Sequence, residues 1–205
     1  MSYGILKTYE EVALKFEIQL QEQIFVQQKE INISEEILDF IQKNLQRRRN
    51  YVSESAICET MISPILNLVA NANDLPVWSH MRFDVDETDG LIGIPDFLIA
   101  SASPIGTTFI RPVICVAEAK KENFNEGWAQ ALSEMIAAQR FNQDALLEVF
   151  GIVTTGSIWQ FAGLKDKILR MDVISYSALE NLQKLFNCLN WLFFKAKTKI
   201  QTESE

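Results

Sequence analysis

The chain contains few of the residues that several common catalytic and structural sites require. Its 205 residues include one histidine, three cysteines, 8 glycines and 5 prolines. The only histidine, His80, has no nucleophile partner near it in the sequence, so serine–histidine catalysis is not expected and His80 is interpreted as a strand residue. The cysteines are odd in number, widely separated and set in apolar surroundings, which favours reduced core thiols over a disulfide framework or a zinc site. No glycine-rich phosphate loop is present, so ATP use is not expected.

Long apolar runs, linkers and internal repeats are also missing. Residues 1–10 have no apolar signal-peptide segment, and charged or turn residues interrupt the longer apolar runs, so neither a signal peptide nor a transmembrane helix is expected. We therefore expect a cytoplasmic protein without membrane contact. The hydrophobic content of 48% excludes general disorder. The chain is interpreted as one domain, 1–205, with a helical extension (1–50), a core (51–165) and a hairpin strand plus closing helix (166–205).

The chain has no excess of positive charge. Lys and Arg number 19 against 27 Asp and Glu, which leaves a net charge of −8. The field of such a molecule repels polyanions, so strong nonspecific binding of nucleic acid by this chain alone is not expected. Local positive charge exists in Arg47–Arg49 and Lys120–Lys121. The arginine triplet has two interpretations, since it could complement the dipole of a preceding helix or contact phosphates.

Three consecutive strands are predicted in the middle of the chain. Residues Val77–Asp86 alternate between apolar and polar, and Asp89–Gly90 then predicts a tight turn. Leu91–Ala100 is a more apolar strand, which places Asp96 on the same face as its apolar neighbours. Val113–Ala119 is almost continuously apolar, as the centre of a sheet should be, and it leads into Lys120.

The remaining elements follow from helical and strand patterns. Helices are expected at Tyr9–Gln28, Glu35–Gln46, Ser53–Ala70, Asn125–Phe141 and Ser177–Ile200. Further strands are expected at Val149–Thr155, Ser157–Leu164 and Lys167–Ile174, the last two as a hairpin around Lys165–Asp166. The two N-terminal helices are expected to pack as a pair over the sheet. The predicted fold class is α/β.

Asp96, Glu118 and Lys120 place three charges on apolar strands, where a charge is costly unless it is paired or binds a metal. Magnesium prefers hard oxygen ligands and is normally held by one or two carboxylates together with substrate phosphate oxygens. Asp96 and Glu118 are therefore candidate Mg²⁺ ligands, with the backbone carbonyl of Ala119 as a third, and Mn²⁺ could substitute. Lys120 would orient the attacking water or stabilise charge on the phosphorus.

The pattern Pro95-Asp96 followed by Glu118-Ala119-Lys120 resembles the signature of the PD-(D/E)XK nuclease superfamily, over roughly residues 50–165. The resemblance implies a restriction-endonuclease-like core, in which helices flank a central mixed β-sheet in the order αβββαβ. It also implies a magnesium-dependent hydrolase of nucleic acid, with DNA as the expected substrate. It also implies supporting roles for Glu59 in the preceding helix and for Gln130 in the following one. The segment around Glu54–Glu59 most resembles the nuclease domain of type I restriction-enzyme motor subunits.

Three alternatives remain open on the sequence alone. The carboxylates and the lysine could form a solvated ion pair at the end of a strand, in an unrelated α/β protein. A nuclease fold could also persist as a catalytically silent binding or assembly module in a restriction, defence or repair complex. Finally, a protein partner or a structured substrate could supply affinity for the nucleic acid. Double-strand cleavage, which needs two sites, would favour a homodimer.

Overall fold

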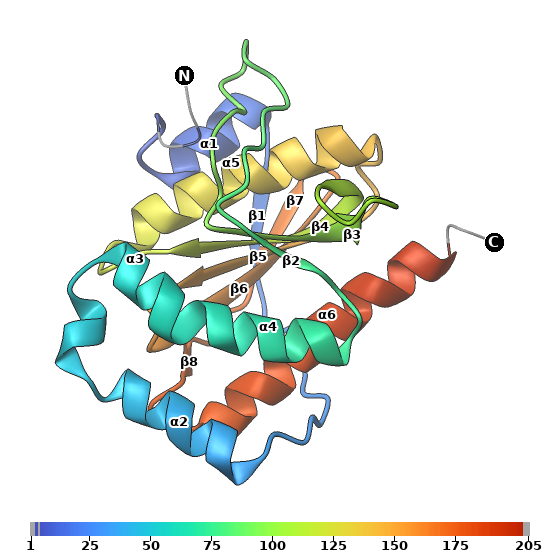
Figure 1. The fold of residues 1–205 in the computed structure, drawn as a ribbon. Coiled ribbons are helices and arrows are strands. Elements are labelled where there is room, and N and C mark those ends of the chain that lie inside the picture. The colour runs from blue at the N-terminus through green and yellow to red at the C-terminus, as the bar shows by residue number, and fades with distance from the viewer. Residues whose placement is uncertain (1–2, 4, 203–205) are drawn as a thin grey trace.

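The computed structural model describes residue 3 and residues 5–202, and within these residues one eight-stranded mixed sheet forms the centre of the protein (Figure 1). The strand order is β1-β7-β6-β5-β4-β3-β2, and β8 pairs with the first residues of β6. The β1–β7 and β4–β5 pairs are parallel and the others antiparallel. The strands are β1 (Gln19–Glu22), β2 (Val77–Ser79), β3 (Phe97–Ala102), β4 (Phe109–Ala119), β5 (Val149–Thr154), β6 (Ile158–Lys165), β7 (Ile168–Met171) and β8 (Tyr176–Ser177).

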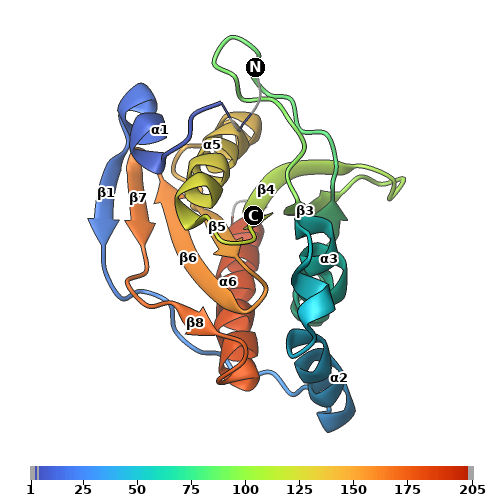
Figure 2. The ribbon, with the colours of Figure 1, turned by 90° about the vertical axis from the view of Figure 1, so that its left-hand side faces the viewer.

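Helices cover both faces of this sheet (Figure 2). They are α1 (Tyr9–Phe16), α2 (Glu35–Leu45), the 3-10 helix η1 (Arg48–Tyr51), α3 (Glu54–Ile57), the π-helix η2 (Cys58–Ile62), α4 (Ser63–Ala72), α5 (Phe124–Asn142) and α6 (Leu182–Thr202). Helices α1 and α5 contribute to the apolar cluster on one face, while α2, α4 and α6 contribute to the cluster on the other. The predicted α/β class with a mixed, helix-flanked sheet is thus confirmed. None of these helices is both long enough and apolar enough to span a membrane, as far as the described residues extend.

Strand β4 is buried on both faces and lies between β3 and β5. Its side chains alternate, so Cys115 and Ala117 join the cluster of α4 and α6 whereas Val116 joins the cluster of α5. Glu118 continues the second set and therefore lies on the α5 face. The predicted strand Val113–Ala119 is confirmed, although it begins four residues earlier, at Phe109.

The helical run that precedes the sheet changes its winding halfway. Helix α3 passes into the π-helix at Cys58 and then into α4, which carries Pro64 in its first turn. Proline has no backbone N–H, so the carbonyl of Thr60 loses its usual helical partner. The side-chain amide of Asn44 donates to that carbonyl instead, at 3.2 Å. The predicted helix Ser53–Ala70 is confirmed in position, with a π-helical segment that its periodicity did not indicate.

Helix α5 lies close to β4 and β5 because a glycine faces the sheet. A Cβ atom added at Gly127 would lie 2.5 Å from Cγ1 of Val153 and 3.0 Å from Cγ of Lys120. We expect Gly127→Ala to lower the free energy of unfolding by about 1–3 kcal/mol, because overpacking outweighs the gain of about 1 kcal/mol in helix propensity. Urea unfolding would measure the change. The exposed Asn125→Ala in the same helix is the control, and an equally stable Gly127→Ala protein would contradict the close packing.

The predicted bounds of the first two strands are largely wrong. The expected strand Val77–Asp86 ends at Ser79, because His80 adopts a left-handed backbone (φ 51°) and donates its N–H to the carbonyl of Asp96 at 3.0 Å. The expected strand Leu91–Ala100 is regular only from Phe97 onward, with an isolated bridge between Asp86 and Leu91. The predicted turn is confirmed, since Gly90 has a φ of 78°.

The N-terminal prediction is also wrong in part. The expected helix Tyr9–Gln28 ends at Phe16, and the chain then forms β1, parallel to β7. Helix α2 matches the expected Glu35–Gln46 closely. The two helices do not form a pair, because Val12 of α1 packs in the cluster with α5 whereas Ile41 of α2 packs in the cluster with α4 and α6.

The C-terminal half agrees better with prediction. Strands β5, β6 and β7 lie where they were expected, and α5 extends the expected Asn125–Phe141 by one residue at each end. The closing helix α6 begins at Leu182, five residues later than expected, and buries its predicted apolar side, namely Leu182, Leu185, Phe186, Leu189, Leu192 and Phe193. All three cysteines are free and buried, as predicted.

Candidate functional site

Asp96 and Glu118 meet where β3 begins and β4 ends. Because the strands are antiparallel and Phe97 pairs with Ala117, the residues just outside this pair are brought together. The backbone N–H of Asp96 donates to Oε1 of Glu118 at 3.2 Å, and the N–H of Ala119 donates to Oδ2 of Asp96 at 2.8 Å. Each carboxylate is thus held by the backbone of the other strand. Their orientation therefore depends on the sheet and not on mobile loops.

Glu118 is the most deeply buried member of this group, with a fully buried side chain. Burial, together with the negative charge of Asp96, raises the pKa of Glu118 to about 8. Its Oε2 atom has no hydrogen-bond partner among the described residues. An unsatisfied buried carboxylate oxygen is costly, so a cation or a proton would stabilise this site.

Lys120 provides the nearest positive charge. Its ammonium lies 3.6 Å from Oε2 of Glu118 and 4.0 Å from a carboxylate oxygen of Glu54, and its side chain is 12% exposed. Burial by itself would lower the pKa of Lys120, but the surrounding carboxylates, Glu118 foremost, outweigh it and raise that pKa. The lysine is therefore charged at neutral pH. Asp96, Glu118 and Lys120 are brought together as the sequence predicted.

Helix α5 adds a carboxyl group that the sequence analysis missed. Glu134 is completely buried and lies close enough to Glu118 for each carboxyl group to affect the pKa of the other. Burial and the charge of Glu118 raise the pKa of Glu134 well above its usual value. Gln130, one helical turn earlier, donates to Oε1 of Glu134 at 3.5 Å. The predicted supporting residue Gln130 thus approaches the site through Glu134.

The preceding helix also contributes a different glutamate from the one predicted. Glu59 is exposed, and no contact in the described part of the chain joins it to Asp96, Glu118 or Lys120. Glu54, at the start of α3, lies beside Lys120 instead. The cause is the helix geometry, because residues five apart on this run point in different directions and the π-helix begins between them.

These two glutamates form a matched pair for mutation. We expect Glu54→Gln to lower any cleavage rate about two- to fivefold, the equivalent of the roughly 0.2–1 kcal/mol that a half-exposed ion pair contributes. Glu59→Gln should leave the rate unchanged, because Glu59 faces solvent. Initial rates on one DNA substrate would separate the two variants. A larger loss in Glu59→Gln than in Glu54→Gln would restore the original prediction for Glu59.

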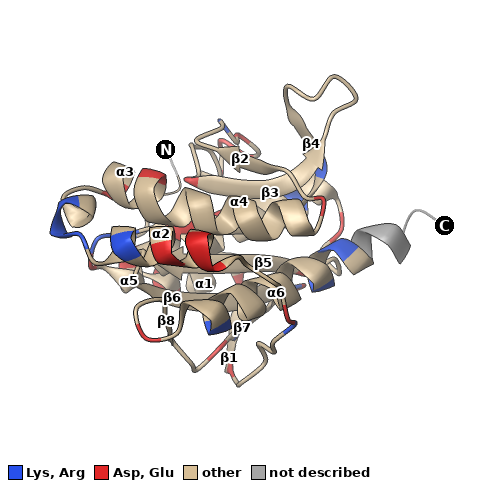
Figure 3. Ribbon diagram, turned by 60° about the horizontal axis from the view of Figure 1, so that its bottom comes forward, with Lys and Arg blue, Asp and Glu red and all other residues tan. Residues whose placement is uncertain are grey.

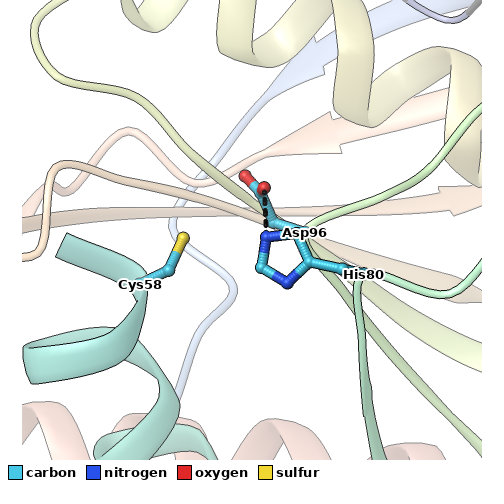
Figure 4. A group of neighbouring side chains, drawn as sticks. All are labelled: Cys58, His80 and Asp96. Carbon is cyan, nitrogen blue, oxygen red and sulfur yellow. Dashed lines mark ion pairs between the residues drawn. The ribbon is translucent and has the colours of Figure 1, made fainter. Parts of the chain in front are cut away.

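On the opposite side of Asp96, a thiol and an imidazole complete the surroundings. Cys58 Sγ, a ring nitrogen of His80 and a carboxylate oxygen of Asp96 all lie within 4.8 Å of one another (Figure 4). His80 Nε2 is 3.5 Å from Oδ1 of Asp96. Burial and the nearby carboxylates raise the pKa of the Cys58 thiol to about 12, so the free thiol is protonated and is a poor nucleophile at neutral pH.

Two further residues, Ala119 and Trp128, occupy defined positions. The amide of Ala119 holds Asp96, and the role of its carbonyl oxygen as a metal ligand stays a prediction. Trp128 is 2% exposed and donates its ring N–H to Gln160 at 2.8 Å. A buried indole cannot stack on a base, so Trp128 is a core residue.

The arginine triplet lies on the surface next to the helix that carries Glu54 (Figure 3). Arg48 and Arg49 belong to η1, beyond the end of α2 at Leu45, and Arg47 donates to the side chain of Asn44 at 3.5 Å. All three side chains are exposed. Their position beyond the last turn weakens a dipole interaction, which falls off within that turn, and leaves them accessible to phosphates.

The sequence contained a signal for Glu134 but not for Cys58. Glu134 is four residues after Gln130 on a predicted helix, which places both on one face, and its neighbours Ala131, Leu132, Ala137 and Ala138 are apolar. An acid on such a face indicates a buried partner. Cys58 and His80 are 22 residues apart in elements whose packing no pattern specifies, so only the tertiary structure could join them.

No protein-family model matches this chain, and no curated protein matches it significantly.

Proposed function

We propose that this protein is a magnesium-dependent nuclease with a restriction-endonuclease-like core, and that it hydrolyses phosphodiester bonds, most naturally those of DNA. The observation that carries the proposal is the meeting of Asp96, Glu118 and Lys120 at one end of β3 and β4. A solvated ion pair at a strand end would not account for it. Glu118 is fully buried, and one of its oxygens has no hydrogen-bond partner in the described structure.

The residues present fit a hard divalent cation. Asp96 presents Oδ1 while its Oδ2 is held by the backbone, and Glu118 presents Oε2 while its Oε1 is held likewise. One free oxygen from each of two carboxylates is the protein contribution that Mg²⁺ usually receives. When bound, the cation would supply Lewis acidity toward the phosphate and the attacking water.

The residues of the chain itself supply the rest of the site. The ammonium of Lys120 is positioned by Glu118 and Glu54 and stays charged at neutral pH. It would therefore orient a water or stabilise negative charge that develops on the phosphate. Glu134, whose buried carboxyl group interacts electrostatically with Glu118, would be a positioning residue for that carboxylate. Gln130 in turn orients Glu134.

The order of elements around the site supports the same assignment. The helical run α3–η2–α4 is followed by β2, β3 and β4, then by α5 and β5, with β5 parallel to β4. This is the αβββαβ order that the resemblance implied. Asp96 and Glu118 lie at the start of β3 and the end of β4, and the residues that support them lie on α3 and α5.

Binding of a polyanion needs positive charge that the molecule as a whole does not provide, since its net charge is −8. The exposed Arg47, Arg48 and Arg49 and the exposed Lys121 flank the helix and strand that carry Glu54 and Lys120. These are the phosphate contacts we propose. A protein partner or a second copy would add the remaining affinity.

The decisive experiment incubates the purified protein with linear, circular, single-stranded and branched DNA and with RNA, in Mg²⁺ or Mn²⁺. We expect cleavage of at least one DNA that EDTA abolishes. If RNA is cleaved and no DNA is, the substrate class is RNA instead of DNA. If nothing is cleaved while Mn²⁺ still binds, as measured by its paramagnetic relaxation of water, the result would favour a silent nuclease-fold module. Absence of both cleavage and metal binding would overturn the proposal.

A further inference from the structure

The group formed by Cys58, His80 and Asp96 combines three types of metal ligand. The thiol enters from the π-helix η2, the imidazole from the end of β2 and the carboxylate from the start of β3 (Figure 4). In a tetrahedral zinc site with bonds of roughly 2.0–2.3 Å, ligand atoms are about 3.4 Å apart. His80 Nε2 and Asp96 Oδ1 already lie 3.5 Å apart, and all three ligand atoms fall within 4.8 Å of one another. Closing this geometry requires only side-chain shifts of about an ångström.

Ser79 can hold His80 in the tautomer that binds a metal through Nε2. Ser79 Oγ lies 2.7 Å from Nδ1 of His80. The other ring nitrogen, Nε2, lies close to Oδ1 of Asp96, and the described residues show no hydrogen bond between these two atoms. With the Nδ1 proton donated to Ser79, the lone pair of Nε2 faces Asp96 and Cys58. A hydrogen bond at the other ring nitrogen is the usual means by which a protein sets the tautomer of a metal-binding histidine.

The backbone that presents these ligands is unusual at two of the three positions. His80 has a left-handed φ of 51°, which few non-glycine residues adopt, and the π-helix begins at Cys58. Both features are costly for the fold and both occur often at functional sites. Phe97 packs edge-on against the His80 ring, with centroids 6.0 Å apart, and limits its rotation.

We propose that Cys58, His80 and Asp96 form a second metal site, selective for thiophilic divalent cations such as Zn²⁺. Three protein ligands leave the fourth tetrahedral position to water. Binding releases the thiol proton of Cys58 to solvent, because the thiolate is the ligand. Magnesium, a hard cation, would not occupy this site, since thiolate and imidazole are poor ligands for it.

Asp96 connects this site to the proposed nuclease centre, so any effect of zinc on cleavage rests on that proposed function. Oδ2 of Asp96 is engaged by the Ala119 amide, so Oδ1 is the oxygen open to a cation, and it is also the oxygen nearest His80. Zinc bound to Cys58, His80 and Asp96 therefore withdraws Asp96 from the magnesium site. We infer that micromolar Zn²⁺ inhibits cleavage by competition for this one carboxylate.

Cobalt(II) tests the site independently of cleavage, because a thiolate bound to Co²⁺ absorbs in the near ultraviolet and tetrahedral Co²⁺ absorbs strongly in the visible. We expect one equivalent of Co²⁺ to produce both signals in the wild-type protein and Zn²⁺ to abolish them. Cys58→Ser should remove the charge-transfer band. His80→Gln, which alters a half-exposed side chain and should fold, should lower zinc affinity by more than the roughly 10- to 100-fold that loss of a hydrogen bond to a metal ligand costs.

Cys188→Ala is the matched control, since Cys188 is equally buried but lies in α6, outside the group. Its spectrum should equal that of the wild type. Absence of a charge-transfer band in the wild type, or a band that persists in Cys58→Ser, would overturn the site. If the protein cleaves DNA, zinc should inhibit the wild type but not Cys58→Ser. If the protein cleaves no substrate, that result counts against the nuclease proposal alone. The cobalt spectra then still decide whether Cys58, His80 and Asp96 form a metal site.

Discussion

Asp96→Asn is expected to reduce Mg²⁺-dependent cleavage by about 100- to 1000-fold. Asparagine keeps an oxygen that can accept from the Ala119 amide, so the sheet edge should remain intact. It removes the negative charge that holds the cation and thereby the electrostatic stabilisation of the transition state, which at comparable sites amounts to roughly 10²–10³ for a single group. Lys120→Met should act similarly, because the methylene packing against α5 is kept while the charge is lost.

Single-turnover cleavage of the preferred DNA would measure both effects. Asp74→Asn is the control, because Asp74 is exposed and pairs with Lys197 away from the strand ends of the site. It should change the rate less than twofold. Urea unfolding should show that Asp96→Asn and Lys120→Met are folded. Wild-type-like cleavage by either variant would exclude the assignment of Asp96 and Lys120.

The second large effect concerns the pH dependence of stability in the absence of metal. The folded-state pKa values of Glu118 and Glu134 are raised, chiefly by burial. The folded protein therefore holds protons that the unfolded chain releases above its ordinary carboxyl pKa. The stabilisation is fully present below that pKa and is lost as pH rises toward the folded value, which for Glu118 is about 8. Between about pH 5 and 8 the free energy of unfolding should fall by about 1.4 kcal/mol per pH unit for each retained proton.

Two comparisons separate the effect of Glu118 and Glu134 on the free energy of unfolding from that of the other titrating groups. In Glu134→Gln the neutral amide replaces the protonated carboxyl and removes one like charge, so the decline with pH should be shallower than in the wild type. Mg²⁺ should stabilise the wild type more at pH 8 than at pH 6, because the cation binds deprotonated Glu118. Urea titrations across this pH range would measure both. Parallel profiles for wild type and Glu134→Gln would show that the two carboxyl groups do not affect each other's protonation.

The elements that the sequence predicted well are those whose burial leaves a periodic pattern. Strands β4 and β5 are largely apolar, and α5 and α6 bury the sides that their periodicity indicated. Strand β1 was mistaken for helix, and its residues Gln19–Glu22 are all exposed, so burial of an apolar face does not determine its conformation. Their strand conformation comes from parallel pairing with β7, a partner about 150 residues away.

The first two strands failed for a different reason. Alternation continues through His80 in the sequence, but the backbone turns left-handed there and the chain leaves the sheet. The energetic cost of that turn is offset by contacts with Asp96, which precedes β3 and is distant in sequence. A pattern that depends only on neighbouring residues cannot reveal such a contact.

By itself, the sequence determined the α/β class, the order of elements from α3 to β5 and the three charged residues Asp96, Glu118 and Lys120, because a charge within an apolar strand needs a specific partner. The tertiary structure decided which groups those partners are. Packing of α5 on β4 brings Glu134 to Glu118, and the start of α3 brings Glu54 to Lys120. The π-helix and the end of β2 bring Cys58 and His80 to Asp96. These contacts join residues on separate elements, and burial of the two apolar clusters, a nonlocal effect, sets how those elements pack.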